Sequence, residues 1–258
     1  MNTILTPVEL QTIEKMREQE LEEARSIQGM MMPAESLHTD SVTTSHEFQP
    51  MAEVGGDFLD YFELTDRTVG IYLGDVSGKG LPAAMYAALA VGTLRGIHKT
   101  GQAPDSVVSL LNKRLLIRGL PQRHCALQYA VFDPTTRVMQ ITSAGMPAPL
   151  HLSSNGCRSL DLGGVPPGLF LTTQYESSTL RLEPGDSVFF CTDGITEAFD
   201  MRDDQFGTER LQALCASHCD DPSALLDCLF SAVKKFVRGR KQADDMAAAL
   251  FHFAPGRR

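Results

Sequence analysis

Four short segments of the sequence carry aspartate in a setting that could do chemistry. Three of them place aspartate beside glycine where an apolar run begins or ends: Gly55-Gly56-Asp57, Gly74-Asp75-Val76-Ser77-Gly78-Lys79-Gly80 and Thr192-Asp193-Gly194. The fourth, Asp244-Asp245-Met246, precedes the last apolar run of the chain. Because glycine has no Cβ, the backbone beside these aspartates can turn sharply and approach a bound group closely.

Aspartates that converge from several strand ends would repel one another without a cation. A hard divalent ion would neutralise that repulsion, since such ions prefer oxygen ligands. No set of His and Cys ligands stands out in the sequence, which favours magnesium or manganese over zinc. Two such ions can lower the pKa of a shared water and withdraw charge from phosphate oxygens. Taken singly, each segment is more typical of a turn or bulge, since aspartate often forms turns, as expected for Asp66 and Asp133. Only the joint occurrence of the four segments indicates a site.

Three other catalytic or metal sites fit the sequence less well. A phosphate-binding P-loop that ends at Gly78-Lys79 would need glycine at position 73 and Ser or Thr at position 80, where the chain has Leu73 and Gly80. None of the six cysteines has arginine at the spacing of a Cys-x5-Arg phosphatase loop. Cys215, His218 and Cys219 lack a second ligand pair for zinc, so reduced thiols in a protein core are the expectation.

Composition narrows the class of protein. With 258 residues, 43% of them hydrophobic, the chain can bury a large core, and a formal net charge of −9 argues against nucleic acid and anionic lipid as partners. The most apolar helical stretch, 81–94, is shorter than a membrane span, and the N-terminus lacks the features of a signal peptide. We therefore expect a cytoplasmic protein without a membrane partner.

The elements that must position the aspartates follow from hydrophobic periodicity. Residues 8–30 are expected to form one helix with an apolar stripe, bounded by Pro7 and Pro33. This helix would either pack on its own domain or serve as a dimer or signalling helix. Strands are expected at 41–49, 57–64, 68–74, 126–132, 137–143, 148–152, 178–183, 187–192 and 247–253, with a turn at 65–67. Helices are expected at 81–99, 104–117, 207–217 and 222–238.

The strands come in antiparallel groups and the helices in pairs, rather than in the alternation of a parallel sheet. This order predicts two antiparallel sheets packed face to face and covered by helices. We therefore expect an N-terminal helix, residues 1–33, followed by a single domain over residues 34–258.

These segments resemble the sporulation-type (SpoIIE-like) and stress-response bacterial serine phosphatases, within the type-2C-like superfamily of metal-dependent protein phosphatases. The resemblance covers about residues 22–250. It is carried in order by EARSIQGMMMP, EVGGDFLDYF, GDVSGKGLPAAMYAA, SAGMPAPL, GGVPPG, LEPGDSVFFCTDGITEA and DDMAAAL. It implies an α+β fold, a four-layer α-β-β-α sandwich, with a site for two Mn²⁺ or Mg²⁺ ions.

By motif match, the resemblance implies the following ligands. Asp57 would hold one ion or both, Asp75 would bridge them, and the Val76 carbonyl would be a backbone ligand. Asp193 would hold the second ion and Asp244 would complete its shell, with Asp245 the weaker candidate. Gly56 and Gly194 would let the backbone approach.

The resemblance also implies a function and partners. The substrate would be a phosphoserine or phosphothreonine on a partner protein, for instance a STAS-type anti-sigma-factor antagonist. The helix at 1–33 would mediate a homodimer and control metal binding. The chain departs from the family's pattern at two places. It lacks the histidine that the family often has in the segment Ala144-Gly145-Met146-Pro147, and it has Ala247 where the family often has Ser or Thr. Both departures concern packing or substrate contacts. The alternative is a regulatory module that binds phosphoproteins without turning them over.

Overall fold

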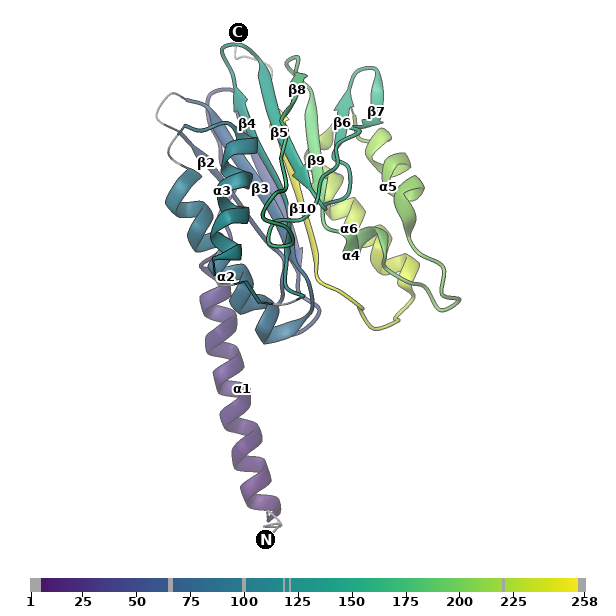
Figure 1. The fold of residues 1–258 in the computed structure, drawn as a ribbon. Helices are drawn as coiled ribbons and strands as arrows, with labels where there is room; N and C mark the ends of the chain where they lie inside the picture. The colour runs from purple at the N-terminus through teal and green to yellow at the C-terminus, as the bar shows by residue number, and fades with distance from the viewer. Residues whose placement is uncertain are drawn as a thin grey trace.

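The computed structural model describes residues 6–64, 67–98, 101–117, 119–120, 122–219 and 221–254. Within these ranges, ten strands form two five-stranded sheets that stack face to face (Figure 1). The turn expected at 65–67 lies mostly outside the described residues, but the strands on either side of it do pair in antiparallel register.

Every pairing between neighbouring strands is antiparallel, as the sequence predicted. The first sheet has the order β1 (Val42–Gln49), β10 (Met246–Phe253), β9 (Ser187–Cys191), β6 (Leu150–Ser153) and β7 (Gly156–Ser159). The second sheet has the order β2 (Phe58–Glu63), β3 (Val69–Val76), β4 (Cys125–Asp133), β5 (Val138–Ala144) and β8 (Ser178–Arg181).

Helices cover the outer face of each sheet. The second sheet is covered by α2 (Gly80–Ile97) and α3 (Pro104–Leu116). The first sheet is covered by α5 (Gly207–Ala216) and α6 (Leu225–Val237), with the one-turn helix α4 (Asp193–Thr196) and the 3₁₀ turn η2 (Pro222–Ala224) beside them (Figure 1). The molecule is therefore the four-layer α-β-β-α sandwich that the sequence predicted.

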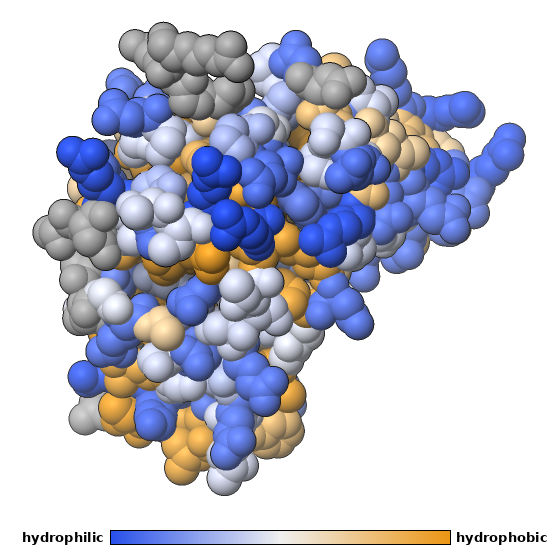
Figure 2. Space-filling model, turned by 90° about the horizontal axis from the view of Figure 1, so that it is seen from above, coloured by the Kyte–Doolittle hydropathy of each residue, from blue (hydrophilic) through white to orange (hydrophobic). Residues whose placement is uncertain are grey.

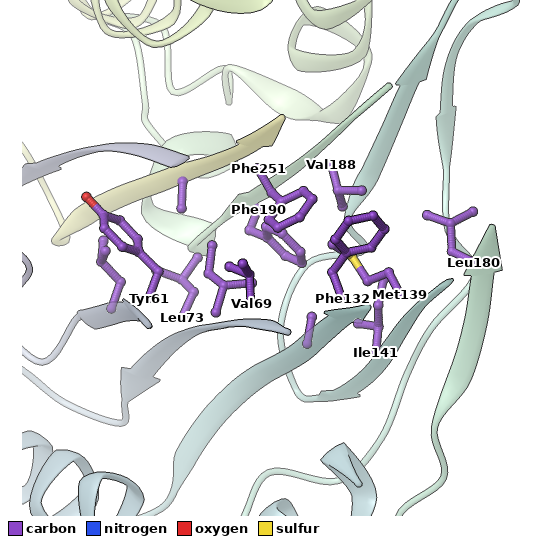
Figure 3. Close-up of a cluster of buried hydrophobic side chains, with 14 of the residues drawn as sticks. Tyr61, Val69, Leu73, Phe132, Met139, Ile141, Leu180, Val188, Phe190 and Phe251 are labelled. Carbon is purple, nitrogen blue, oxygen red and sulfur yellow. The ribbon is translucent and has the colours of Figure 1, made fainter. Parts of the chain in front are cut away.

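The main core lies between the two sheets. Val69, Ile71 and Leu73 of β3 point into this layer, and Phe251 of β10 lies against Phe132 from the other sheet with ring centroids 5.2 Å apart (Figure 3). The alternate residues of the same strands are buried under the helices on the other face. Burial on both faces explains why these strands appear in the sequence as nearly continuous apolar runs.

Within the described part of the chain, α2 is the one helix that is long and apolar enough to meet the composition of a membrane span. Its buried face consists mainly of alanines with Val91 and Leu94, and this face packs in the cluster that joins α2 and α3 to the second sheet. The apolar composition of α2 is accounted for in part by this packing.

Helix α1 (Pro7–Gly29) projects away from the sandwich (Figure 1). It begins with a capping box in which Thr6 and Glu9 bond to each other's backbone N–H groups. Only Gln28 is buried along its length. The opposite end of the molecule, viewed in Figure 2, is covered mostly by hydrophilic residues with smaller apolar patches between them.

The structure differs from the predicted elements at a few places. Strand β7 was not predicted, because its four residues, GCRS, show no apolar alternation. Helix α4 was not predicted either, since a single turn that begins with Asp193-Gly194 has the composition of a loop. The helix expected at 222–238 is divided into η2 and α6. All six cysteines are free thiols as expected. Three of them are buried in the core, whereas Cys157 and Cys219 are half-buried and Cys228 is exposed.

Candidate metal centre

The aspartate segments meet at one end of the sandwich, at the boundary between the two sheets. Asp57 directly precedes β2 and Asp75 is the penultimate residue of β3, so both belong to the second sheet. Asp193 follows β9, and Asp244 and Asp245 precede β10, so these three belong to the first sheet. The structure thus brings together side chains that the sequence separates by up to 188 positions.

Asp57 is the most deeply buried of these carboxylates, with an exposed fraction of 2%. The Thr192 hydroxyl donates a hydrogen bond of 2.8 Å to its Oδ2. Burial, and then the charge of Asp75, hold the pKa of Asp57 well above its usual range. Burial, and then the charge of Asp193, raise the pKa of Asp75 to about 7, although its hydrogen bond with Asp57 acts in the opposite direction. These carboxylates therefore lack the positive charge that would stabilise their ionised forms.

Asp193 lies at the rim of the site, where its side chain reaches solvent. The protein atoms around it nevertheless raise its pKa, as do the charges of Glu197 and Asp244. The next residue must be glycine because a Cβ at Gly194 would overlap the backbone carbonyl of Asp245. This contact fixes the start of α4 against the start of β10, and Asp193 beside Asp244.

The adjacent residues Asp244 and Asp245 have different surroundings. Asp245 is buried and accepts hydrogen bonds of 2.7 Å from the backbone N–H groups of Met51 and Gly56. Asp244 keeps 43% of its side chain exposed and forms an ion pair of 2.9 Å with Lys79. Asp245 therefore holds the loop before Asp57, whereas Asp244 faces the open side of the site.

The backbone around Asp57 is packed too tightly for side chains. A Cβ at Gly55 would overlap the Asp245 carboxylate, and a Cβ at Gly56 would lie 2.9 Å from the carbonyl oxygen of Val76. Glycine at position 56 thus lets the loop approach the Val76 carbonyl closely. The close approach aligns Asp57 with Asp75 and Val76 across the two segments.

Three polar residues of the site were not singled out from the sequence. Thr192 bonds to Asp57, and Lys79 pairs with Asp244 and also donates to the Ala243 carbonyl. Gln28, at the end of α1, donates to the Gly55 carbonyl at 2.7 Å and accepts from the Gly55 N–H at 3.0 Å. Lys79 could have been found as the cation within an otherwise acidic and glycine-rich set of motifs.

The donor set of the site fits a hard metal ion by its chemistry rather than by a preformed geometry. In the part of the chain that the structure describes, no three Asp, Glu, His or Cys side chains already surround a single point as a ready-made site. The chemistry of the donors does fit a hard divalent cation, because four carboxylates converge, three of them have raised pKa values, and Lys79 is the one cation paired with them in these residues.

Comparison with known proteins supports the same grouping. The family model for stage II sporulation protein E (SpoIIE) matches residues 65–254. The phosphoserine phosphatase RsbU of Bacillus subtilis is 23% identical over 88% of this chain and 68% of its own length. Across three curated relatives, the chain spans from 43% to 68% of the relative's length, about half in two of them.

Solved structures show the same fold. The SiaA-PP2C domain of Pseudomonas aeruginosa has a TM-score of 0.83 at 20% identity, over 94% of this chain and 98% of that domain. RsbX in complex with magnesium has a TM-score of 0.66 at 13% identity, over 85% of this chain and 99% of RsbX. Since the family model covers most of the sequence and the fold agrees, this chain belongs to the SpoIIE family.

Proposed function

We propose that this chain is a protein serine/threonine phosphatase of bacterial signalling, which hydrolyses a phosphoserine or phosphothreonine ester on a partner protein by metal-activated water. The observation that supports this most directly is the convergence of Asp57, Asp75, Asp193 and Asp244 from two different sheets. Raised carboxylate pKa values at one spot are typical of a site built for cations rather than for stability.

The proposed site holds two Mn²⁺ or Mg²⁺ ions, bound by Asp57, Asp75, the Val76 carbonyl, Asp193 and Asp244. When bound, such ions lower the pKa of water and neutralise phosphate oxygens, so that no protein nucleophile is required. The nearby contacts of Asp245 favour Asp244 over Asp245 as the ligand, since both oxygens of Asp245 already accept backbone hydrogen bonds.

Other residues of the chain would prepare the site for the ester. The Thr192 hydroxyl fixes the orientation of Asp57, and Asp245 fixes the loop that carries Gly56. The Lys79 ammonium lies on the open side, beside Asp244, where it can attract the phosphate dianion. These groups position and attract the substrate, and no proton transfer by them is required.

The proposal divides the chain into a phosphatase domain, residues 34–258, and a regulatory helix, residues 1–33. Helix α1 leaves apolar side chains exposed to solvent, among them Leu10, Ile13 and Met16, with exposed fractions of 47%, 49% and 60%. A second copy of α1 would cover them in a homodimer. Because two hydrogen bonds join Gln28 to the Gly55 backbone, a change in the position of α1 would move the loop before Asp57.

Similarity to RsbU suggests the class of partner. The proposed substrate is a phosphorylated signalling protein of the kind used in partner switching, such as a STAS-domain anti-sigma-factor antagonist, and the proposed location is the cytoplasm. The acidic charge of the chain, −9, remains an argument against nucleic acid.

The test replaces single carboxylates. With Mn²⁺, the wild-type chain should release p-nitrophenol from p-nitrophenyl phosphate and remove phosphate from phosphoprotein, whereas Asp75→Asn and Asp193→Asn should each lose activity by about 100-fold or more. Asp133→Asn, at the end of β4 where the turn to β5 begins, is the control and should keep full turnover. A folded, manganese-saturated wild-type chain without turnover would instead support the alternative, a module that only binds phosphoproteins.

A further inference from the structure

A pocket of about 440 Å³ opens directly beside the carboxylate cluster. It shares Lys79, Gly194 and Asp244 with that cluster and extends from there along α6 and the loop 240–244. Its volume lies within the range of ligand-binding pockets and suits one large side chain or a short peptide segment. A group bound at Asp244 would thus have its neighbouring atoms in this pocket, which we call the α6 pocket.

The inner wall of the α6 pocket is apolar. Phe230, Val233 and Val237 come from one face of α6, and Phe199 comes from the segment after α4. Phe230 and Val233 belong to the core cluster beneath this helix, so the wall is held rigidly by packing behind it. Such a wall favours an apolar side chain over a charged one.

The rim of the pocket is basic. Lys234, Arg240 and Lys241 line it together with Lys79, while Glu197 and Asp244 are the acidic residues among its described lining. Lys79 is paired with Asp244, and Arg240 is paired with Asp203 at 2.6 Å.

The two remaining rim lysines, Lys234 and Lys241, are exposed and form no ion pair with any residue that the structure describes. In a chain with a net charge of −9, this is a local excess of positive charge that attracts anions.

Part of this basic character has a structural explanation. Lys234 and Lys235 lie in the last turn of α6, where cations stabilise the helix dipole. Arg240 has other structural contacts, since it pairs with Asp203 and its guanidinium lies 5.3 Å from the centroid of the Phe199 ring. Lys241 has neither explanation, because it lies beyond the end of α6 in the loop that leads to Asp244 and forms no ion pair with the described residues. Its position on the rim of an apolar pocket, next to the proposed metal centre, points to a ligand.

We propose that the α6 pocket binds the segment of the phosphoprotein substrate that flanks the phosphorylated side chain, and that this segment carries a large apolar residue with acidic neighbours. The proposal rests on the proposed phosphatase function and names the class of substrate sequence that the site selects. The apolar residue packs on Phe199 and Val237, and the acidic neighbours pair with Lys234 and Lys241.

The test compares three substrates with Mn²⁺ present: p-nitrophenyl phosphate, a synthetic phosphoserine peptide flanked on both sides by Leu and Glu, and a matched peptide flanked by Ser and Gln. The wild-type chain should prefer the Leu/Glu peptide over the Ser/Gln peptide by about tenfold in kcat/KM. In Lys234→Glu/Lys241→Glu, this preference should be lost through a rise in KM, and kcat/KM for the Leu/Glu peptide should fall about tenfold relative to that for p-nitrophenyl phosphate.

A matched control is available in α3. Lys113 and Arg114 are exposed in the last turn of that helix, so Lys113→Glu/Arg114→Glu makes the same change of net charge at an exposed helix end away from the α6 pocket. The control should retain the wild-type preference. Equal use of both peptides by the wild-type chain, or equal loss of preference in the two double variants, would overturn the α6 pocket proposal. Failure of the wild-type chain to hydrolyse any of the three substrates would overturn the phosphatase function itself.

Discussion

At the scale of the residue, the two neighbouring aspartates before β10 show how surroundings assign different roles to identical side chains. Asp245 satisfies two backbone N–H groups of the loop that leads to Asp57, and it is buried. Asp244 is half exposed and its one ion pair, with Lys79, lies at the surface. A buried acceptor that serves two donors contributes to stability, whereas an exposed ion pair contributes little.

These surroundings give opposite expectations for the two alanine variants. Asp245→Ala should lower the free energy of unfolding by about 2–3 kcal/mol, because the N–H groups of Met51 and Gly56 lose their acceptor. Asp244→Ala should change it by about 1 kcal/mol or less, but should lower turnover by about 100-fold. Urea unfolding in EDTA and p-nitrophenyl phosphate turnover in Mn²⁺ separate the two effects. A stable Asp245→Ala or a fully active Asp244→Ala would contradict the assignment.

The residues of the site were predictable from sequence to different degrees. Asp57, Asp75 and Asp193 could be identified as candidates because glycine accompanies each of them at a strand end. The contacts of Thr192 and Gln28 were not predictable, since each side chain bonds to a partner 135 or 27 positions away, and only the tertiary fold selects such partners. The sequence likewise could not distinguish Asp244 from Asp245 as the ligand, because the contacts that separate them are made with residues distant in the chain.

At the scale of the element, helix α1 is unusual in burying a single residue, Gln28, along its 23 residues. A lone helix is marginal in water, and most helices are stabilised by packing of an apolar face. Here Leu10, Ile13 and Met16 in the N-terminal half of the helix remain exposed. In the C-terminal half, Leu21 and Ala24 are half-buried beside the start of α2, and Gln28 bonds to Gly55. The exposed apolar residues of the N-terminal half therefore require a partner.

If a second copy of α1 is that partner, Ile13→Glu/Met16→Glu should convert a dimer into a monomer, because it buries four charges in the shared apolar interface. Light scattering at micromolar concentration measures the mass. The double change Gln11→Glu/Gln19→Glu adds the same charge at polar positions of α1 and should leave the dimer intact. A wild-type chain that is monomeric under these conditions would remove the homodimer from the proposed function.

The longer elements could be predicted from sequence, and the shortest could not. Strands β3, β4 and β10 are buried on both faces, so their sequences are mostly apolar and their ends are marked by turn residues. Strand β7 and helix α4 are four residues each. Their existence depends on a neighbouring strand or on the close contact at Gly194, which the local sequence does not encode.

At the scale of the whole molecule, the clustered carboxylates oppose folding when no cation is present. The folded-state pKa values of Asp57, Asp75 and Asp193 are raised, so the folded chain holds protons there that the unfolded chain has already released. Their contribution to stability is therefore present below the unfolded-state pKa, near 4, and is lost as the pH rises through their folded pKa values, about 7 for Asp75.

Removal of one buried charge should relieve this cost. In EDTA at pH 8, Asp57→Asn should raise the free energy of unfolding by about 1–3 kcal/mol over wild type. The gain should be smaller at pH 5, because the raised pKa of Asp57 favours its neutral form as the pH falls. The amide can still accept the Thr192 hydrogen bond. Thermal unfolding at the two pH values measures the difference. The same stability for wild type and variant at pH 8 would show that Asp57 bears no uncompensated charge.

The division of the site between two layers has a mechanical consequence. Asp57 and Asp75 are anchored in one sheet, and Asp193 and Asp244 in the other. Ions held jointly by these carboxylates would link the two sheets, and their binding energy would add to the cohesion of the phenylalanine-rich layer between the sheets. By the same reciprocity, any force that shifts one sheet relative to the other would weaken metal binding.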